Sequence, residues 1–285
     1  MLVTLKEVLE YASSQNKAVG SFNTPNLESI LAVIAAAEEL KEPVILMHAQ
    51  VHEEIMPLSV IGPVMIERAK AAKVPVCVHL DHGETLDYIR KALELGFTSV
   101  MYDGSTLDYR ENVKNTKAAV AMAQLYGASV EAEIGTLGKR ESGHEEEEGG
   151  ADTPSAVYTN PADARNFVEA TAIDALACSF GTAHGLYLKK PCLDMTVLDN
   201  IKAILDIPLV MHGGSGVSEE DYKRVIQKGV RKINYYTYMA KAGADEIRSR
   251  LKQQNTTVYF HEIAEWGAAA MKDNVKQAIT VFSGK

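Results

Sequence analysis

Residues 73–83 read KVPVCVHLDHG, an apolar run that ends in an acid, a histidine and a glycine. A strand that is buried on both faces is expected to be apolar and then to stop at a turn. This predicted strand ends instead at Asp81 and His82, and His79 lies two residues before the acid. Asp81 is either the N-cap of the helical segment that follows or, with His82, the start of a functional site.

Short apolar, β-branched runs like this one alternate with longer segments of helical period along the chain. About eight such β-α units fit into 285 residues, which favours a closed (β/α)8 barrel, or TIM barrel, over an open doubly wound sheet. No GxGxxG follows the first strand, so a dinucleotide-binding sheet has no support. The expected architecture is α/β, with residues 1–285 forming one barrel domain that carries an additional C-terminal helix. The predicted strands are Ala18–Asn23, Val44–His48, Val76–Leu80, Ser99–Asp103, Ser129–Ile134, Ala175–Phe180, Leu209–His212 and Lys232–Tyr235.

The chain is acidic, with 29 Lys and Arg against 38 Asp and Glu, a net charge of −9 and a sequence pI near 5.4. This balance argues against a nucleic-acid or anionic-membrane partner, because no basic surface would collect phosphates. No apolar run approaches the length of a membrane span, and the N-terminal MLVTLKEVLEYASS is typical of an amphipathic helix and not of a signal peptide. A small phosphorylated ligand held at one local site is still compatible with this charge.

The three cysteines, Cys77, Cys178 and Cys192, are scattered and do not have the spacing of a metal site. Cys77 and Cys178 lie in apolar runs, which favours reduced and buried thiols. Reduced thiols predict a cytoplasmic protein.

Polar side chains gather where the predicted strands end. Active sites of (β/α)8 barrels lie at the C-terminal ends of the strands, so the barrel hypothesis makes these residues candidates for chemistry. The residues at or near strand exits are Asn23, Asp81, His82, Asp103, Glu131, Glu133, His184, His212 and Asn234.

Three of these residues, His82, His184 and His212, stand at separate strand exits and can converge on one divalent ion. Three imidazoles with an open fourth position form a catalytic zinc arrangement. The alternative is that each histidine makes only a local hydrogen bond. His48 is a weaker candidate, and His52, like His144 and His261, is interpreted as a surface or loop residue.

Two glycine clusters, GTAHG at residues 181–185 and HGGSG at 212–216, follow late strands. Such clusters let backbone N–H groups approach a phosphate, and Ser215 can add a hydroxyl. Plain turn chemistry explains each cluster equally well. Between residues 135 and 160 lies an acidic loop too long for a simple connection, and long loops of this kind are often functional. Glu141 lies in this loop between Gly138 and Gly143.

The chain resembles the class II ketose-bisphosphate aldolases, which are metal-dependent (β/α)8 barrels and include the fructose- and tagatose-bisphosphate aldolases. The resemblance is carried, in order along the chain, by SFNTPNLES, VHLDHGET, SVMYDGS, VEAEIGTLG, DALACSFGTAHGLY, PLVMHGGSG and GVRKIN. It implies reversible retro-aldol cleavage of a phosphorylated ketose to dihydroxyacetone phosphate and an aldehyde, as a carbon-carbon lyase of carbohydrate metabolism such as glycolysis. It also implies a homodimer or homotetramer, for which the C-terminal helices are possible contacts.

Residue by residue, the resemblance implies a catalytic Zn²⁺ on His82, His184 and His212. A second or alternative divalent site would involve Glu133 and Asp103, and a monovalent cation, Na⁺ or K⁺, would bind near the glycines. Asp81 would protonate the oxygen of the aldehyde product, and Glu141 would move the C3 proton of the ketone fragment. The positions implied around the substrate and its phosphate are Asn23, Gly185, Gly213, Ser215, Asn234 and Thr237.

The chain departs from the family pattern mainly at positions of substrate recognition. Ala49 replaces the usual Ser or Thr after the 44–48 strand, Leu188 replaces a lysine, and Ser142 replaces an acid. Tyr235, Tyr236 and Tyr238 replace small residues and an acid after the last strand, where tyrosines at the mouth would narrow the site. We therefore expect a substrate other than fructose 1,6-bisphosphate, or not chiefly that sugar. Two further possibilities are a zinc-binding paralogue without aldolase activity and a zinc hydrolase or epimerase that uses the same triad.

Overall fold

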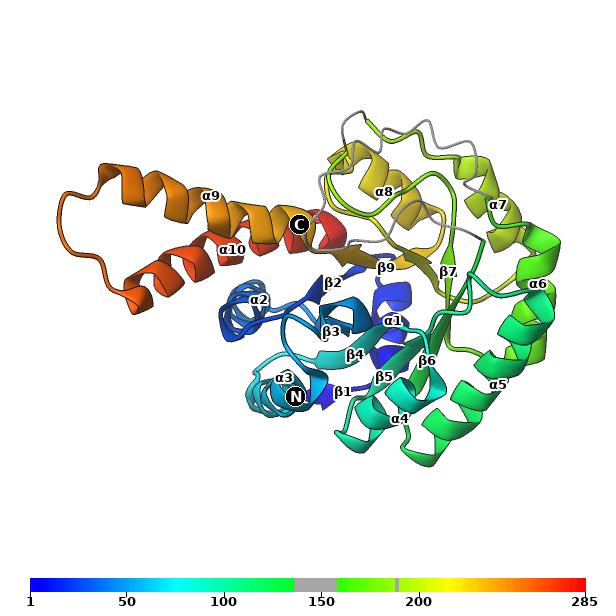
Figure 1. Ribbon diagram of the computed structural model, residues 1–285. Helices are drawn as coiled ribbons and strands as arrows, with labels where there is room; N and C mark the ends of the chain where they lie inside the picture. The colour runs from blue at the N-terminus through cyan, green and yellow to red at the C-terminus, as the bar shows by residue number, and fades with distance from the viewer. Residues whose placement is uncertain (136–157, 188–189) are drawn as a thin grey trace.

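Eight parallel strands close into a barrel in this computed structural model, which describes residues 1–135, 158–187 and 190–285 (Figure 1). Each strand pairs with the next along the chain, and β9 pairs with β2 to close the ring. The predicted TIM barrel is thereby confirmed. The barrel strands are β2 (Val19–Asn23), β3 (Val44–Ala49), β4 (Val76–Gly83), β5 (Ser99–Tyr102), β6 (Ser129–Ile134), β7 (Ala175–Cys178), β8 (Leu209–Met211) and β9 (Val230–Tyr235).

Helices follow the strands and cover the outside of the barrel (Figure 1). Their inner faces pack against the outward-facing apolar residues of the strands, and this layer forms the larger hydrophobic core. The helices are α2 (Leu27–Leu40), α3 (Leu58–Ala71), α4 (Leu86–Glu94), α5 (Tyr109–Leu125), α6 (Pro161–Thr171), α7 (Met195–Ile204), α8 (Glu219–Gln227), α9 (Thr237–Gln253) and α10 (Phe260–Ser283), and a 3₁₀ turn, η1 (Gln50–His52), follows β3.

The N-terminal segment differs from the single helix expected. Leu2–Val3 form a short strand, β1, that pairs with the start of β4 outside the ring. Helix α1 (Leu5–Ser14) then begins after Thr4, whose side chain accepts a hydrogen bond from the Glu7 N–H in a capping box. Its apolar face packs against residues at the beginnings of the strands, including Val19 and Cys77, and so closes the N-terminal end of the barrel.

The C-terminal pair α9 and α10 forms an antiparallel hairpin that extends away from the barrel (Figure 1). Helix α10, predicted as an additional helix, returns along α2 and ends with Phe282 buried near β2. The tip of the hairpin exposes apolar side chains, with Tyr259 62% and Phe260 80% exposed.

No helix in the described ranges combines the length and the hydrophobicity that crossing a membrane requires. The three cysteines are unpaired thiols, buried at Cys77 and Cys178 and exposed at Cys192. Burial raises the pKa of the Cys77 thiol to about 12, so this thiol is inert.

Candidate active site

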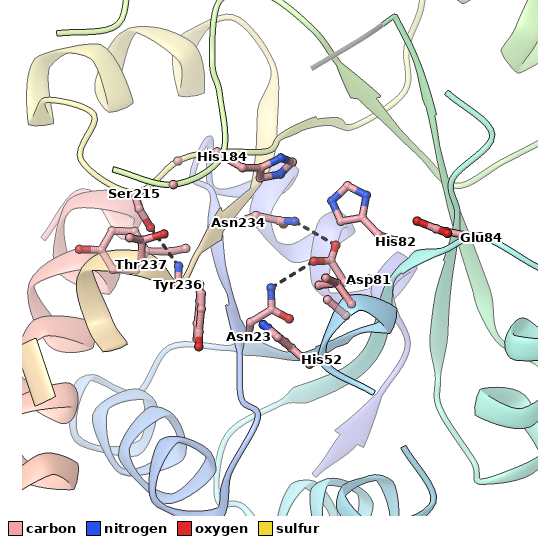
Figure 2. Close-up of a pocket in the computed structure, with 16 residues that line it drawn as sticks. Asn23, His52, Asp81, His82, Glu84, His184, Ser215, Asn234, Tyr236 and Thr237 are labelled. Carbon is pink, nitrogen blue, oxygen red and sulfur yellow. Dashed lines mark hydrogen bonds between the residues drawn. The ribbon is translucent and has the colours of Figure 1, made fainter. Parts of the chain in front are cut away.

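A cavity opens at the C-terminal end of the barrel, on the side opposite α1. Its walls come from the exits of β2, β3, β4, β7, β8 and β9, and Figure 2 shows the 16 residues that line it. Each residue implied at the site by the resemblance either lines this cavity or lies directly beneath it, apart from Glu141. That residue, like Ser142 and Leu188, is outside the described residues.

An irregularity at the end of β4 turns both Asp81 and His82 into the cavity. The pairing of β4 with β5 shifts register between Leu80 and Gly83, and His82 adopts a left-handed backbone with φ 46°. A bulge of this kind breaks the alternation that would send neighbouring side chains to opposite faces. Gly83 is needed because a Cβ there would lie 2.8 Å from the Met101 carbonyl oxygen.

The alternative role of Asp81 as a helix cap is wrong. Helix α4 is capped by Thr85, whose side chain accepts a hydrogen bond from the Tyr88 N–H. Asp81 is only 2% exposed and lies at the barrel mouth, four residues before that cap. Its carboxylate does not cap the helix and instead lines the cavity.

The three histidines from separate strands converge. His82, His184 and His212 each offer one ring nitrogen within 4.8 Å of the others, and their ring centroids are 4.7–6.0 Å apart. Each ring also keeps one nitrogen (Nε2 of His82 and Nδ1 of the other two) without a hydrogen-bond partner among the described residues. Burial lowers the pKa of His184 to about 3, so its ring is neutral at pH 7 and has a lone pair to offer.

Carboxylates surround this triad. Asp103 Oδ2 lies 2.7 Å from His82 Nδ1, and Glu133 Oε2 lies 3.5 Å from His212 Nδ1. His82, Asp103 and Glu133 form a second group whose potential ligand atoms lie within 4.8 Å of one another. Although burial lowers the pKa of His82, Asp81 and Asp103 raise it to about 9, which reflects an environment that favours positive charge. Imidazole nitrogens without partners, set among carboxylates, fit a divalent cation.

Two asparagines hold Asp81. Asn23 Nδ2 donates to one carboxylate oxygen at 3.2 Å, and Asn234 Nδ2 donates to the other at 3.1 Å (Figure 2). Burial alone raises the pKa of Asp81, but His82 and other nearby positive groups bring it well below its usual range. The group is therefore a carboxylate. The amide oxygens of both asparagines lack a partner within the described structure and can accept hydrogen bonds from a ligand.

The glycine clusters meet at one end of the cavity. Gly213 has φ 61°, and a Cβ there would lie 2.3 Å from the Ala183 carbonyl oxygen, so the two loops approach too closely for a side chain. The Tyr187 hydroxyl joins them, accepting from the Ala183 N–H and donating to the Gly213 carbonyl. Gly185, Ser215 and Thr237 line this end, where α9 begins. Backbone amides and a helix N-terminus together favour an anion.

Beneath the mouth lies a charged layer that the sequence interpretation did not assign. Glu131 is fully buried and contacts Lys232 Nζ at 2.8 Å and His212 Nε2 at 2.9 Å. Burial raises the pKa of Glu131, but Lys232 and His212 outweigh this and lower it to about 2. Glu131 thus fixes the His212 ring with its Nδ1 toward the triad. The Glu-x-Glu spacing of residues 131 and 133, which puts both on one face of a strand, is the signal for this layer.

The placement predicted for Lys232 needs correction. It is the third residue of β9, not the first, and its side chain points into the barrel with no exposure. It pairs with Glu131 and is not among the residues that line the cavity.

His52 and the tyrosines also differ from expectation. His52 is not a surface residue: it is 5% exposed, lines the cavity and packs against Tyr236 with ring centroids 5.2 Å apart. Tyr235 does not project its ring into the mouth, because that ring packs against Phe22 and Phe282 in the core. Tyr238 lies over Gly216. Tyr235 and Tyr236 are among the residues that line the cavity, and Tyr238 is not.

Comparisons with known proteins identify a family model and solved structures that are similar to this chain. The family model of class II fructose-bisphosphate aldolase matches residues 3–285. The YdjI aldolase from Escherichia coli K12 is 32% identical with a TM-score of 0.86, over 99% of this chain and 97% of that one. A putative fructose-1,6-bisphosphate aldolase from Coccidioides immitis is 27% identical with a TM-score of 0.85, over 98% and 95%. Fructose-bisphosphate aldolase from Campylobacter jejuni, 23% identical over 99% and 95%, shares the fold with a TM-score of 0.80.

Proposed function

Because the chain belongs to the class II fructose-bisphosphate aldolase family, we propose that it catalyses the reversible retro-aldol cleavage of a phosphorylated ketose to dihydroxyacetone phosphate and an aldehyde. The observation that carries the proposal is the meeting of Asp81 with three histidines that each keep a ring nitrogen without a partner in the described structure. An acid-base group and a set of open metal ligands at one barrel mouth are the two parts that such a reaction needs.

The proposed cofactor is one Zn²⁺ held by His82, His184 and His212. When bound, it would polarise the ketone carbonyl as a Lewis acid and stabilise the charge that develops on the ketone fragment. Asp103 and Glu133 would supply a second or alternative divalent site. A monovalent cation, Na⁺ or K⁺, is proposed near the glycines at 213–216.

Asp81 performs the proton transfer at the substrate's C4 oxygen in this proposal. In cleavage its carboxylate takes the C4 hydroxyl proton while the C3–C4 bond breaks, and the bonding electrons pass to the ketone fragment. Glu141 then returns a proton to C3 of that fragment. In condensation both transfers reverse, and Asp81 protonates the former aldehyde oxygen. Asn23 and Asn234 orient Asp81 through its two oxygens, and their own amide oxygens accept hydrogen bonds from substrate hydroxyls.

The substrate's C1 phosphate is proposed to bind at the glycine end of the cavity. Gly185, Gly213 and Ser215 would present backbone N–H groups there, and the N-terminus of α9 at Thr237 adds a favourable dipole. Anchoring one phosphate fixes the reacting carbons beside Asp81.

The preferred substrate is proposed to differ from fructose 1,6-bisphosphate. Ala49 removes a hydroxyl from the cavity wall, and Tyr236 adds a large ring to it. The chain departs from the family pattern at these two positions and at Leu188, Ser142, Tyr235 and Tyr238, while the residues proposed for the metal and for acid-base chemistry are all present.

We also propose a cytoplasmic homo-oligomer, dimer or tetramer, with contacts through α9 and α10. The hairpin extends from the barrel and exposes Leu251, Tyr259 and Phe260, and apolar groups gathered at such a tip favour burial against another chain. Light scattering after chromatography tests this: Phe260→Glu is expected to lower the molar mass observed for the wild type.

The test of the function is release of dihydroxyacetone phosphate from a panel of ketose phosphates by zinc-loaded protein, followed with a coupled dehydrogenase. We expect release that a chelator abolishes. Zinc-loaded protein that cleaves no ketose phosphate would refute aldolase activity, and efficient cleavage of fructose 1,6-bisphosphate alone would refute the changed preference.

A further inference from the structure

The cavity has a second end, opposite the glycines, that the proposed reaction leaves without an occupant. It is formed at the exit of β3 by Ala49, Val51 and His52, with Tyr236 beside them. In Figure 2 His52 lies at the lower edge of the cavity and His184 at its upper edge. A substrate held by its C1 phosphate at the glycines and by its C4 hydroxyl at Asp81 would place the rest of its chain here.

His52 has the burial and the hydrogen-bonding capacity of a residue that recognises a ligand. It is 95% buried by side-chain packing, since only 5% of its surface is exposed, and it still borders the cavity. Its Nδ1 has no hydrogen-bond partner among residues 1–135, 158–187 and 190–285. A buried polar atom without a partner is costly, and the ring that carries this one lines the cavity, so a ligand in the cavity is the group best placed to complete it.

Tyr236 is fixed next to His52. The two rings are tilted by 55° with centroids 5.2 Å apart. The backbone N–H of Tyr236 donates to Ser215 Oγ at 3.0 Å, so the same residue is tied to the glycine end of the cavity. The His52–Tyr236 pair is therefore held at a fixed distance from the proposed phosphate site. A fixed distance of this kind is needed if the enzyme is to select substrates by chain length.

The charge of this end disfavours a second phosphate. Among the residues that line the cavity in the described structure there is no Lys or Arg, and the carboxylates are Asp81 and Glu84. Phosphate groups of substrates are recognised by Arg, by Lys or by converging backbone amides, and the amides are at the glycine end.

We propose that His52 and Tyr236 bind the aldehyde half of the substrate and that this half is an uncharged, hydroxylated chain, so that the substrate class is a ketose 1-phosphate and not a ketose bisphosphate. This inference rests on the proposed aldolase function. Burial lowers the pKa of His52, although Asp81 acts in the opposite direction, so the ring is neutral at pH 7 and offers one donor and one acceptor to hydroxyls.

The experiment measures aldol addition by zinc-loaded enzyme, with dihydroxyacetone phosphate as the donor. Glyceraldehyde and a tetrose are compared with glyceraldehyde 3-phosphate as acceptors. We expect wild-type kcat/KM to be higher for the unphosphorylated aldehydes. A higher kcat/KM for glyceraldehyde 3-phosphate overturns the proposal.

Variants of His52 test whether this side chain sets the preference for unphosphorylated aldehydes. His52→Phe keeps the ring but removes its hydrogen bonds, and is expected to lower kcat/KM for glyceraldehyde about tenfold, in line with loss of one hydrogen bond. His52→Gln keeps a donor and an acceptor and should stay within about threefold of wild type, while His52→Arg should raise the preference for glyceraldehyde 3-phosphate. An unchanged ratio of the two aldehydes in both His52→Phe and His52→Arg overturns the proposal.

Exchange of the C3 proton of dihydroxyacetone phosphate with deuterium separates this inference from the function on which it rests, because exchange needs no aldehyde. Exchange by the wild type, with no response of aldehyde kinetics to His52 substitution, overturns only the aldehyde subsite. Absence of both exchange and addition overturns the aldolase function and the subsite with it. His261→Ala, which changes an exposed histidine at the start of α10, is the matched control and should leave the ratio of kcat/KM for the two aldehydes at its wild-type value.

Discussion

Two polar layers lie inside the barrel, one above the other. They contain similar residue types, but these residues serve different purposes in the two layers. Because side chains two residues apart point the same way on a strand, each upper residue has a lower neighbour. The pairs, upper before lower, are Asp81 and His79 on β4, Glu133 and Glu131 on β6, and Asn234 and Lys232 on β9. In the upper layer Asp81 and Asn234 line the cavity and Glu133 lies directly beneath it, and the lower layer is enclosed by the strands.

In the lower layer the Glu131 carboxylate pairs with Lys232 Nζ at 2.8 Å. The neutral His79 ring has its Nδ1 2.8 Å from Ser99 Oγ, and its Nε2 lies 3.7 Å from Glu131. In the upper layer the carboxylates of Asp81, Asp103 and Glu133 outnumber the positive groups, and imidazole nitrogens lack partners within the described chain. The lower layer thus has an internal ion pair that neutralises its charges, whereas the upper layer has ring nitrogens available to a bound group. We therefore expect upper-layer changes to affect activity and lower-layer changes to affect stability and metal affinity.

The largest effect is expected at Asp81. Asp81→Asn keeps the shape of the side chain but cannot accept the C4 hydroxyl proton, so kcat for cleavage should fall by about 10²–10⁴-fold, the usual worth of a general acid-base group. Bound zinc and melting temperature should stay near wild type. A variant that retains more than a tenth of wild-type kcat would remove Asp81 from the acid-base role.

Lys232 provides the contrasting test in the lower layer. Lys232→Met leaves the buried Glu131 carboxylate without its cation, which should destabilise the fold by about 3–5 kcal/mol. Denaturant unfolding of the metal-free protein measures this. If stability is unchanged, the lower layer is not held together by its ion pair.

Glu131 joins the layers, because it lies in the lower one and contacts His212 of the triad. Glu131→Gln is expected to weaken zinc affinity by about 10- to 100-fold, as loss of an outer partner of a metal-binding histidine usually does. Competition with a chromophoric chelator measures the affinity.

The double variant Glu131→Gln with Lys232→Met is the control. It removes both buried charges, so stability should recover while zinc affinity stays low. Recovery of both together would show that Glu131 acts on the metal only through the stability of the fold.

The smallest effect is expected at Ser99, whose hydroxyl lies 2.8 Å from His79 Nδ1. Ser99→Ala removes one buried hydrogen bond and should cost about 1 kcal/mol of stability, without changing kcat. A fall in kcat larger than threefold would mean that the layers are coupled more closely than their contacts indicate.

The sequence predicted the barrel and the strand exits because alternation of apolar runs with helical segments is a local pattern. It could not show that Asp81 and His82 share one face, because this depends on a bulge between β4 and β5 that the alternation rule does not contain. His52 was misplaced since it follows β3 in a 3₁₀ turn, with no glycine or strand end to mark it. The neighbours Tyr235 and Tyr236 pack their rings differently, Tyr235 against Phe22 and Phe282 and Tyr236 against His52, and the sequence alone does not show this.

Stoichiometric zinc titration of metal-free protein, with release of dihydroxyacetone phosphate as the readout, tests whether His82, His184 and His212 hold one catalytic zinc. The three-histidine centre predicts that activity toward the best ketose phosphate rises linearly and levels off at about one zinc per chain, as a single triad requires, while His212→Ala stays inactive. Full activity without metal would rule out a catalytic zinc at the three histidines. So would protein that holds one zinc per chain yet releases dihydroxyacetone phosphate from no ketose phosphate.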